Sequence, residues 1–137
     1  MISLAHAAAL HEAGLRWHPR PGDRFAVRTL EDQVFTISDM VVEPHDYPTG
    51  TVLGFNGTTE WALDSVALED ALWLPAEHQL RDLLGGTFRS LTRDAADAEP
   101  RWTVDVQLPE GTRAFTAADP SDAYAEALLT LVRAAAA

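Results

Sequence analysis

The sequence predicts an α+β fold: a single domain in which an antiparallel sheet of hairpins carries helices packed on one face. Segments with helical caps and helical apolar spacing occur near both ends and in the middle of the chain. Short β-prone runs bounded by turn residues fill the intervals between them. No repeat or low-complexity linker marks a boundary, so we expect one domain over residues 1–137.

The first helix is expected over residues 3–13. Ser3 has a side-chain oxygen that can cap the first turn, and Gly14 can adopt the positive φ that ends a helix. Leu15 is then placed to contact Leu10, the apolar contact of a Schellman ending. The segment is rich in alanine, so its helix propensity is high but its buried face is poorly defined.

The stretch from Trp17 to Asp23 contains two prolines and a glycine, which exclude regular structure, and Trp17 is expected to plug the core. β-prone residues then occur around Phe25–Val27 and again over Val34–Val42. The segment Leu30–Gln33 joins these runs, so the sequence predicts a hairpin.

Glu43–Gly50 is polar and contains two prolines, which predicts a loop. Asn56-Gly57 follows the β-prone run Thr51–Phe55 and precedes Thr58–Trp61. Because both residues tolerate positive φ, this pair predicts a type I′ hairpin.

In the middle of the chain, the apolar run Ala71–Leu74 predicts a buried strand or extended segment, with Trp73 as a core anchor. A helix is expected to begin at Pro75, whose fixed φ suits the first helical position. Gly85-Gly86 is expected to end it. Its predicted apolar stripe consists of Ala76, Leu80, Leu83 and Leu84.

Strands are expected over residues 87–92, 101–108 and 112–116, followed by a helix that Asp119 caps. The predicted apolar face of this helix consists of Tyr124, Ala127, Leu128, Leu131 and Ala135.

From Pro75 onwards the order α-β-β-β-α is that of a double-stranded RNA-binding domain. Such domains contact phosphates with basic residues at the start of the second helix, where this chain has acids, so we take the likeness as one of topology only.

Charge is distributed unevenly along the chain, whose formal net charge is −11. The segment Thr29–Leu80 contains no Arg, and its ten acidic residues are Glu31, Asp32, Asp39, Glu43, Asp46, Glu60, Asp64, Glu69, Asp70 and Glu77. Such a segment repels nucleic-acid phosphates and anionic lipid but attracts a basic protein. We therefore expect no nucleic-acid partner and no membrane partner, and any protein partner should be basic.

The chain has no Cys, and all ten of its basic residues are Arg. These absences exclude disulfide scaffolds, thiol catalysis, Schiff-base chemistry and the lysine-containing phosphate loop. The N-terminus lacks a basic leader before an apolar run, and no segment approaches the length of a membrane span. We expect a cytoplasmic protein without a cofactor.

No stretch contains a recognisable active site. The serines lack a Gly-x-Ser-x-Gly elbow, and His6 and His11 are expected to cap a helix or face solvent. The best metal candidates are Asp39, Glu43, His45 and Asp46, which offer hard oxygen ligands and one imidazole. Their spacing matches no ligand signature, so we favour a solvated polar loop over a metal site.

Three segments carry a resemblance to other proteins: Glu12–Phe25 (EAGLRWHPRPGDRF), Ala71–Leu84 (ALWLPAEHQLRDLL) and Phe115–Leu128 (FTAADPSDAYAEAL). This pattern is similar to that of a group of small uncharacterised proteins from actinobacteria and from phages. The resemblance covers most of the chain and implies no activity.

Together these observations favour a non-enzymatic adaptor that binds another macromolecule. The interaction residues that we expect on its acidic surface are Glu43, Asp46, Glu60 and Asp64. Two alternatives remain: a small metal-dependent hydrolase that uses the acidic 39–46 loop, and an acidic mimic of nucleic acid. A pocket with convergent polar groups would favour the enzyme, and an exposed apolar patch ringed by acids would favour the binding protein.

Overall fold

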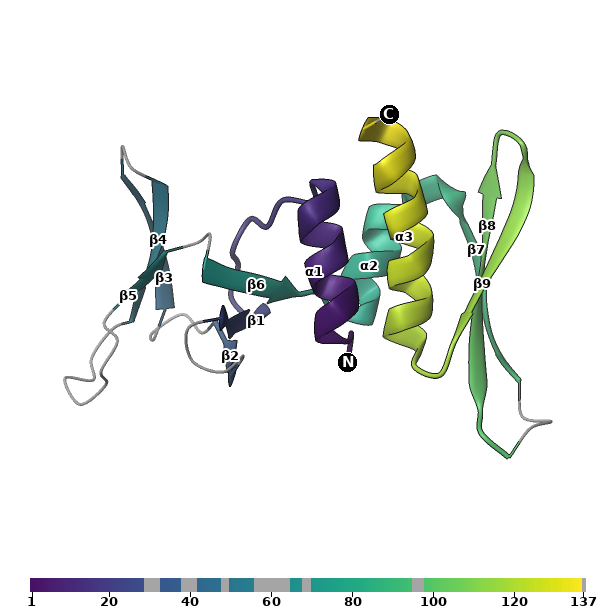
Figure 1. Ribbon diagram of the computed structural model, residues 1–137, viewed down its shortest axis with the longest axis horizontal. Helices are drawn as coiled ribbons and strands as arrows, with labels where there is room; N and C mark the ends of the chain where they lie inside the picture. The colour runs from purple at the N-terminus through teal and green to yellow at the C-terminus, as the bar shows by residue number, and fades with distance from the viewer. Residues whose placement is uncertain are drawn as a thin grey trace. The chain divides into compact units, whose positions relative to one another are not determined.

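A computed structural model describes residues 1–28, 33–37, 42–47, 50–55, 65–67, 70–94 and 98–136 (Figure 1). These residues divide into two compact units. We call Met1–Arg16 together with Pro75–Ala137 the terminal unit, and Trp17–Leu74 the inserted unit. The predicted α+β class and antiparallel pairing are confirmed, and the described strands form three three-stranded sheets.

The described part of the terminal unit contains three α-helices, one short 3-10 helix and one sheet. Its elements are α1 (Leu4–Ala13), α2 (Glu77–Leu84), the short 3-10 helix η3 (Gly85–Thr87), β7 (Phe88–Asp94), β8 (Arg101–Leu108), β9 (Gly111–Ala117) and α3 (Pro120–Ala136). The strands pair antiparallel in the order β7-β8-β9. Figure 1 shows the helices on one side of this sheet, as predicted.

Helix α1 has the predicted ends. The backbone N–H of His6 donates to Ser3 Oγ (3.1 Å), which caps the first turn. Gly14 has a φ of 112°, and the N–H of Leu15 donates to the carbonyl of Leu10 (3.0 Å). These are the bonds of a Schellman ending. Local chemistry therefore determines both ends of this helix.

Helix α2 begins at Glu77, so the prediction that it begins at Pro75 was wrong by two residues. Ala76 is extended (φ −76°, ψ 163°) and acts as the N-cap, and its N–H donates to Gln79 Oε1 (2.9 Å). The predicted stripe is also narrower than expected. Leu80 and Leu84 are buried, whereas Ala76 is exposed and Leu83 is 44% exposed. A helix of two turns buries one narrow face against α3.

Helix α3 is capped as predicted, because the N–H of Ser121 donates to Asp119 Oδ1 (2.8 Å). Its buried surface is wider than the predicted stripe. The buried residues are Ser121, Ala123, Tyr124, Ala125, Ala127 and Leu128, whereas Leu131 is half-buried and Ala135 is exposed. The helix contacts α1 and α2 as well as β8 and β9, so its first turns are covered on several sides.

The inserted unit contains β1 (Arg24–Val27), β2 (Gln33–Thr36) and β6 (Ala71–Leu74), which form an antiparallel sheet in the order β2-β1-β6. The predicted first hairpin and the predicted strand over residues 71–74 are confirmed. Trp73 was predicted to anchor the core but is half-buried. The fully buried aromatic residue of this sheet is its neighbour across the strands, Phe25.

The third sheet consists of β3 (Val42–Tyr47), β4 (Gly50–Phe55) and β5 (Ser65–Ala67), in the order β3-β4-β5. The predicted loop over residues 43–50 was therefore wrong. Pro44 lies in β3, an edge strand, where a residue without an N–H is tolerated. The strand predicted over residues 51–55 is confirmed as β4, but the type I′ turn at Asn56-Gly57 lies outside the described residues.

Within the part of the chain that the structure describes, no helix combines the length and apolar character needed to cross a membrane.

Candidate functional site

The predicted acidic interaction and metal residues lie in the inserted unit, and the structure describes the backbone of three of them. Glu43, His45 and Asp46 lie on β3, opposite Gly54, Val52 and Thr51 of β4, respectively. Positions 43 and 45 share one face of a strand, and position 46 lies on the other. Asp39, Glu60 and Asp64 lie outside the described residues, so the metal hypothesis stays a prediction.

Acidic charge is concentrated in the inserted unit. Residues 17–74 contain three Arg and ten Asp or Glu, whereas the terminal unit contains seven Arg and eleven Asp or Glu. The three Arg are Arg20, Arg24 and Arg28, so all of them precede β2. The structural division of the chain therefore separates an acidic unit from one in which the two signs are more nearly balanced.

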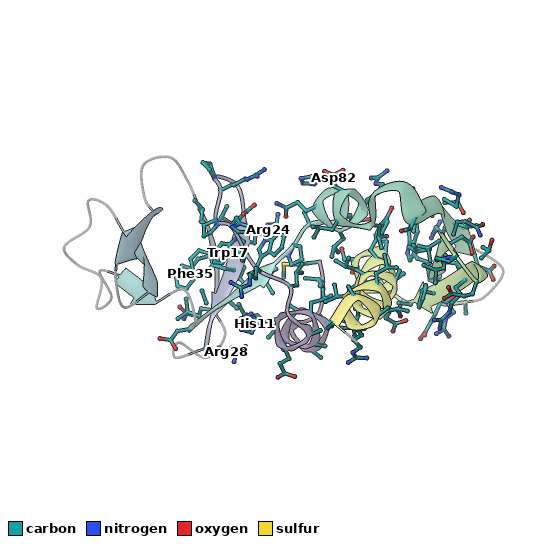
Figure 2. The ribbon with its side chains drawn as sticks, turned by 90° about the horizontal axis from the view of Figure 1, so that it is seen from above. His11, Trp17, Arg24, Arg28, Phe35 and Asp82 are labelled. Atoms are coloured by element: carbon teal, nitrogen blue, oxygen red, sulfur yellow. The ribbon has the colours of Figure 1, made fainter. Side chains whose placement is uncertain are left out.

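Aromatic side chains cluster on one face of the sheet β2-β1-β6. Figure 2 labels two of them, Trp17 and Phe35. Phe25 lies opposite Phe35 on one side and Trp73 on the other, so the three side chains share a face. The Trp17 ring lies 5.4 Å from the Phe25 ring, and the Phe35 ring lies 5.6 Å from it, measured between centroids. Phe25 is fully buried, but Trp17, Phe35 and Trp73 are half-buried. The cluster thus presents aromatic surface to solvent.

Asp23 fixes Trp17 in this cluster. The indole N–H of Trp17 donates to Asp23 Oδ2 (2.9 Å), and the backbone N–H of Arg20 donates to the same oxygen (3.1 Å). Asp23 is only 4% exposed, and its carbonyl accepts from the N–H of Ile37 (2.8 Å). The proline-rich stretch is therefore held to the end of β2. Trp17 was predicted to plug the core, but it is half-buried and only its ring contact with Phe25 reaches a buried residue.

A second polar cluster joins α1 to α3 in the terminal unit. His6 Nδ1 lies 2.7 Å from Ser3 Oγ and 3.2 Å from Asp122 Oδ1, and His6 Nε2 lies 3.3 Å from Glu126 Oε1. The N–H of Ser3 donates to Asp122 Oδ1 (2.8 Å). Sequence reasoning missed these partners, which are 119 and 120 residues away from Ser3 and His6, respectively. The four-residue spacing of Asp122 and Glu126 was the one available signal.

A serine, an imidazole and carboxylates in hydrogen-bonding range are the components of a nucleophile relay. Here, however, Ser3 Oγ already accepts a hydrogen bond from the backbone N–H of His6 in α1, and the same hydroxyl is hydrogen-bonded to His6 Nδ1. A relay would also need a site for the reacting group next to the serine. The arrangement instead matches a polar clamp between two helices.

The described part of the terminal unit also has an open hollow between α1 and the end of α3. It is lined by Ala9, Glu12, Ala13, Arg133 and Ala136. Three of these residues contribute only methyl groups, and Glu12 and Arg133 supply its charged side chains.

Neither a family model, nor a curated protein, nor a solved structure matches this chain. The resemblance to small actinobacterial and phage proteins therefore stays a prediction.

Proposed function

We propose that the chain is a non-enzymatic protein that binds a basic macromolecular partner through its inserted unit. The observation that supports this proposal is the concentration of acidic residues in that unit, which contains ten Asp or Glu and three Arg. Charge of one sign attracts an oppositely charged partner over a Debye length and raises the association rate. Glu43, Asp46, Glu60 and Asp64 are the residues proposed to attract it.

The aromatic cluster is the proposed source of binding affinity, which exposed charges alone supply only weakly. Exposed charges mainly set the association rate, whereas partly exposed aromatic side chains supply much of the affinity at interfaces. Phe35 is half-buried and its neighbour Val34 is 46% exposed, and both lie on β2, at the edge of their sheet. Apolar contacts in the same unit as the acidic residues fit a partner that has both basic and apolar residues.

The test compares two variants of equal charge change. The first replaces Glu43 by Gln and Asp46 by Asn in the inserted unit, and the matched control replaces Glu99 and Glu110, exposed acids of the terminal unit, by Gln. A partner captured by the wild type is purified, and its association rate is measured for all three proteins. We expect roughly a tenfold lower rate for the first variant and little change for the control.

Salt provides the second part of this test. Raising the ionic strength from ~0.01 M to ~0.15 M shortens the Debye length from ~30 Å to ~8 Å, so the association rate should fall. A rate indifferent to salt and to both pairs of substitutions would overturn the proposal. Displacement of the partner by duplex DNA would instead favour the acidic mimic of nucleic acid.

A further inference from the structure

The two edges of the sheet β7-β8-β9 differ in how they are protected. An unpaired edge strand can pair with another chain, and bulges and charged side chains normally prevent this. Edge strand β7 has both devices: its register with β8 shifts between Phe88 and Ser90, and it carries Arg89, Arg93 and Asp94. The β7 edge is therefore blocked.

Edge strand β9 lacks most of these devices. All seven of its residues lie opposite residues of β8 without a shift in register, and it contains no proline. Among the strands that the structure describes, β9 pairs with β8 alone. Thr112, Arg113, Ala114 and Thr116 are exposed, so no other described element covers the strand there. The regular edge of β9 is a template for one further strand.

The sequence of β9 is complementary to itself. In an antiparallel pair centred on Ala114, Ala114 of each copy lies opposite Ala114 of the other, and Thr112 lies opposite Thr116. Threonine pairs of this kind stabilise antiparallel sheets. Arg113, the single charged residue of β9, then lies opposite Phe115. Its guanidinium already lies 5.1 Å from the Phe115 ring centroid of its own strand, so the same cation–π contact is available across the pair.

This register also keeps like charges apart. The two Arg113 side chains lie on opposite sides of the two-fold axis rather than facing one another. Because the same edge serves both copies, the interface closes after two chains. The bulged β7 edges then form the ends of a six-stranded sheet and prevent its growth into a filament.

We propose that β9 is a self-association edge, through which two copies of this chain pair over Gly111–Ala117 into a continuous antiparallel sheet. The occupant of the edge is a second copy, because the strand complements itself in charge and side-chain type. Strand β9 belongs to the terminal unit, and the proposal does not depend on the proposed function. Each chain carries a net charge of −11, so dimerisation should strengthen as salt rises. Binding of a basic partner should weaken under the same change.

The test uses sedimentation equilibrium of the full chain from ~10 μM to ~1 mM, a range suited to a small interface. We expect reversible dimers for the wild type. Ala114→Glu and Ala114→Lys each place like charges directly opposite at the two-fold axis and should weaken the dimer about tenfold or more. An equimolar mixture of these two variants should regain dimers, because Glu then faces Lys.

The matched control is Thr92→Glu, which introduces the same charge on an exposed residue of the β7 edge and should leave the dimer unchanged. Melting curves of every variant confirm folding. A wild type that stays monomeric to the highest concentration overturns the proposal. So does a mixture of the two Ala114 variants that gains no dimer, or a dimer that Thr92→Glu abolishes and Ala114→Glu does not.

Discussion

Two buried polar atoms of the described residues, Trp73 Nε1 and Tyr124 Oη, have no hydrogen-bond partner. Tyr124 is the more fully buried residue, and its ring lies 5.7 Å from that of Phe88 and 6.0 Å from the Arg81 guanidinium. Burial raises the pKa of Tyr124, Arg81 opposes this effect, and Glu77 adds to it. The tyrosine thus contributes its ring to packing, while its hydroxyl is desolvated without compensation.

We therefore expect Tyr124→Phe to leave stability unchanged or to raise it by up to about 1 kcal/mol near neutral pH. In the wild type the unfolded chain ionises Tyr124 near pH 10.0, while the raised pKa of the folded chain keeps it protonated to a higher pH. The folded state then binds more protons, so stability falls as the pH rises above that value. Tyr124→Phe should therefore lose less stability than the wild type as the pH rises. Chemical denaturation between about pH 8 and pH 11 measures both effects.

The control for this experiment is Tyr47→Phe, which changes the only other tyrosine. Equal losses of stability at high pH in the wild type and in Tyr124→Phe would show that Tyr124 ionises equally in the folded and unfolded states.

At the scale of residues, the sequence predicts positions that act on their neighbours in the chain. Ser3, Gly14 and Asp119 were identified because capping depends only on nearby backbone groups. The partners of His6 lie on α3, and no local pattern specifies which helix faces α1. The difference between Phe25 and Trp73 was likewise unpredictable, since it depends on which strand lies in the middle of the sheet.

At the scale of elements, the tie between α1 and α3 depends on Ser3 more than on any other single residue of the clamp. Ser3 Oγ caps α1, its N–H donates to Asp122, and its hydroxyl holds His6. The flanking ion pairs add less, because Glu126 is 41% exposed and the Met1 amino group and Asp119 are 44% and 38% exposed.

Ser3→Ala should destabilise the chain by about 1 kcal/mol, with the loss of the cap as the main cause. Ser3→Thr keeps a capping hydroxyl and should recover most of the loss. Thermal melting measures both variants, and amide hydrogen exchange in α1 locates the change. Equal melting temperatures for Ser3→Ala and the wild type would show that the clamp adds no stability.

Some boundaries of helices and strands depend on nearby residues, and others depend on which elements pair in the fold. Strand β8 and the two ends of α1 have the predicted bounds. Alternating apolar residues define the strand, and capping residues define the ends of the helix. The loop predicted over residues 43–50 is wrong because Pro44 excludes a central strand but not an edge strand. Proline content alone therefore cannot separate a loop from the edge of a sheet. Nothing local identifies the β9 edge either, since it depends on which strands pair.

At the scale of the whole molecule, the chain passes between the two units twice. Arg16 of the terminal unit is followed directly by Trp17, and Leu74 directly by Pro75. The terminal unit needs both ends of the chain, because α1 packs on α3. The inserted unit, residues 17–74, is of the size at which a domain is only marginally stable by itself.

We therefore expect residues 1–137 to unfold in one cooperative transition, as a single domain does. Tryptophan fluorescence can test this unit by unit. Trp102 is the only tryptophan of the terminal unit, so Trp102→Phe leaves Trp17, Trp61 and Trp73 as reporters of the inserted unit alone. Far-UV circular dichroism reports mainly the α-helices, all of which lie in the terminal unit of the described structure. The two signals should give the same midpoint in urea, and separate midpoints would show that the two units are independent domains.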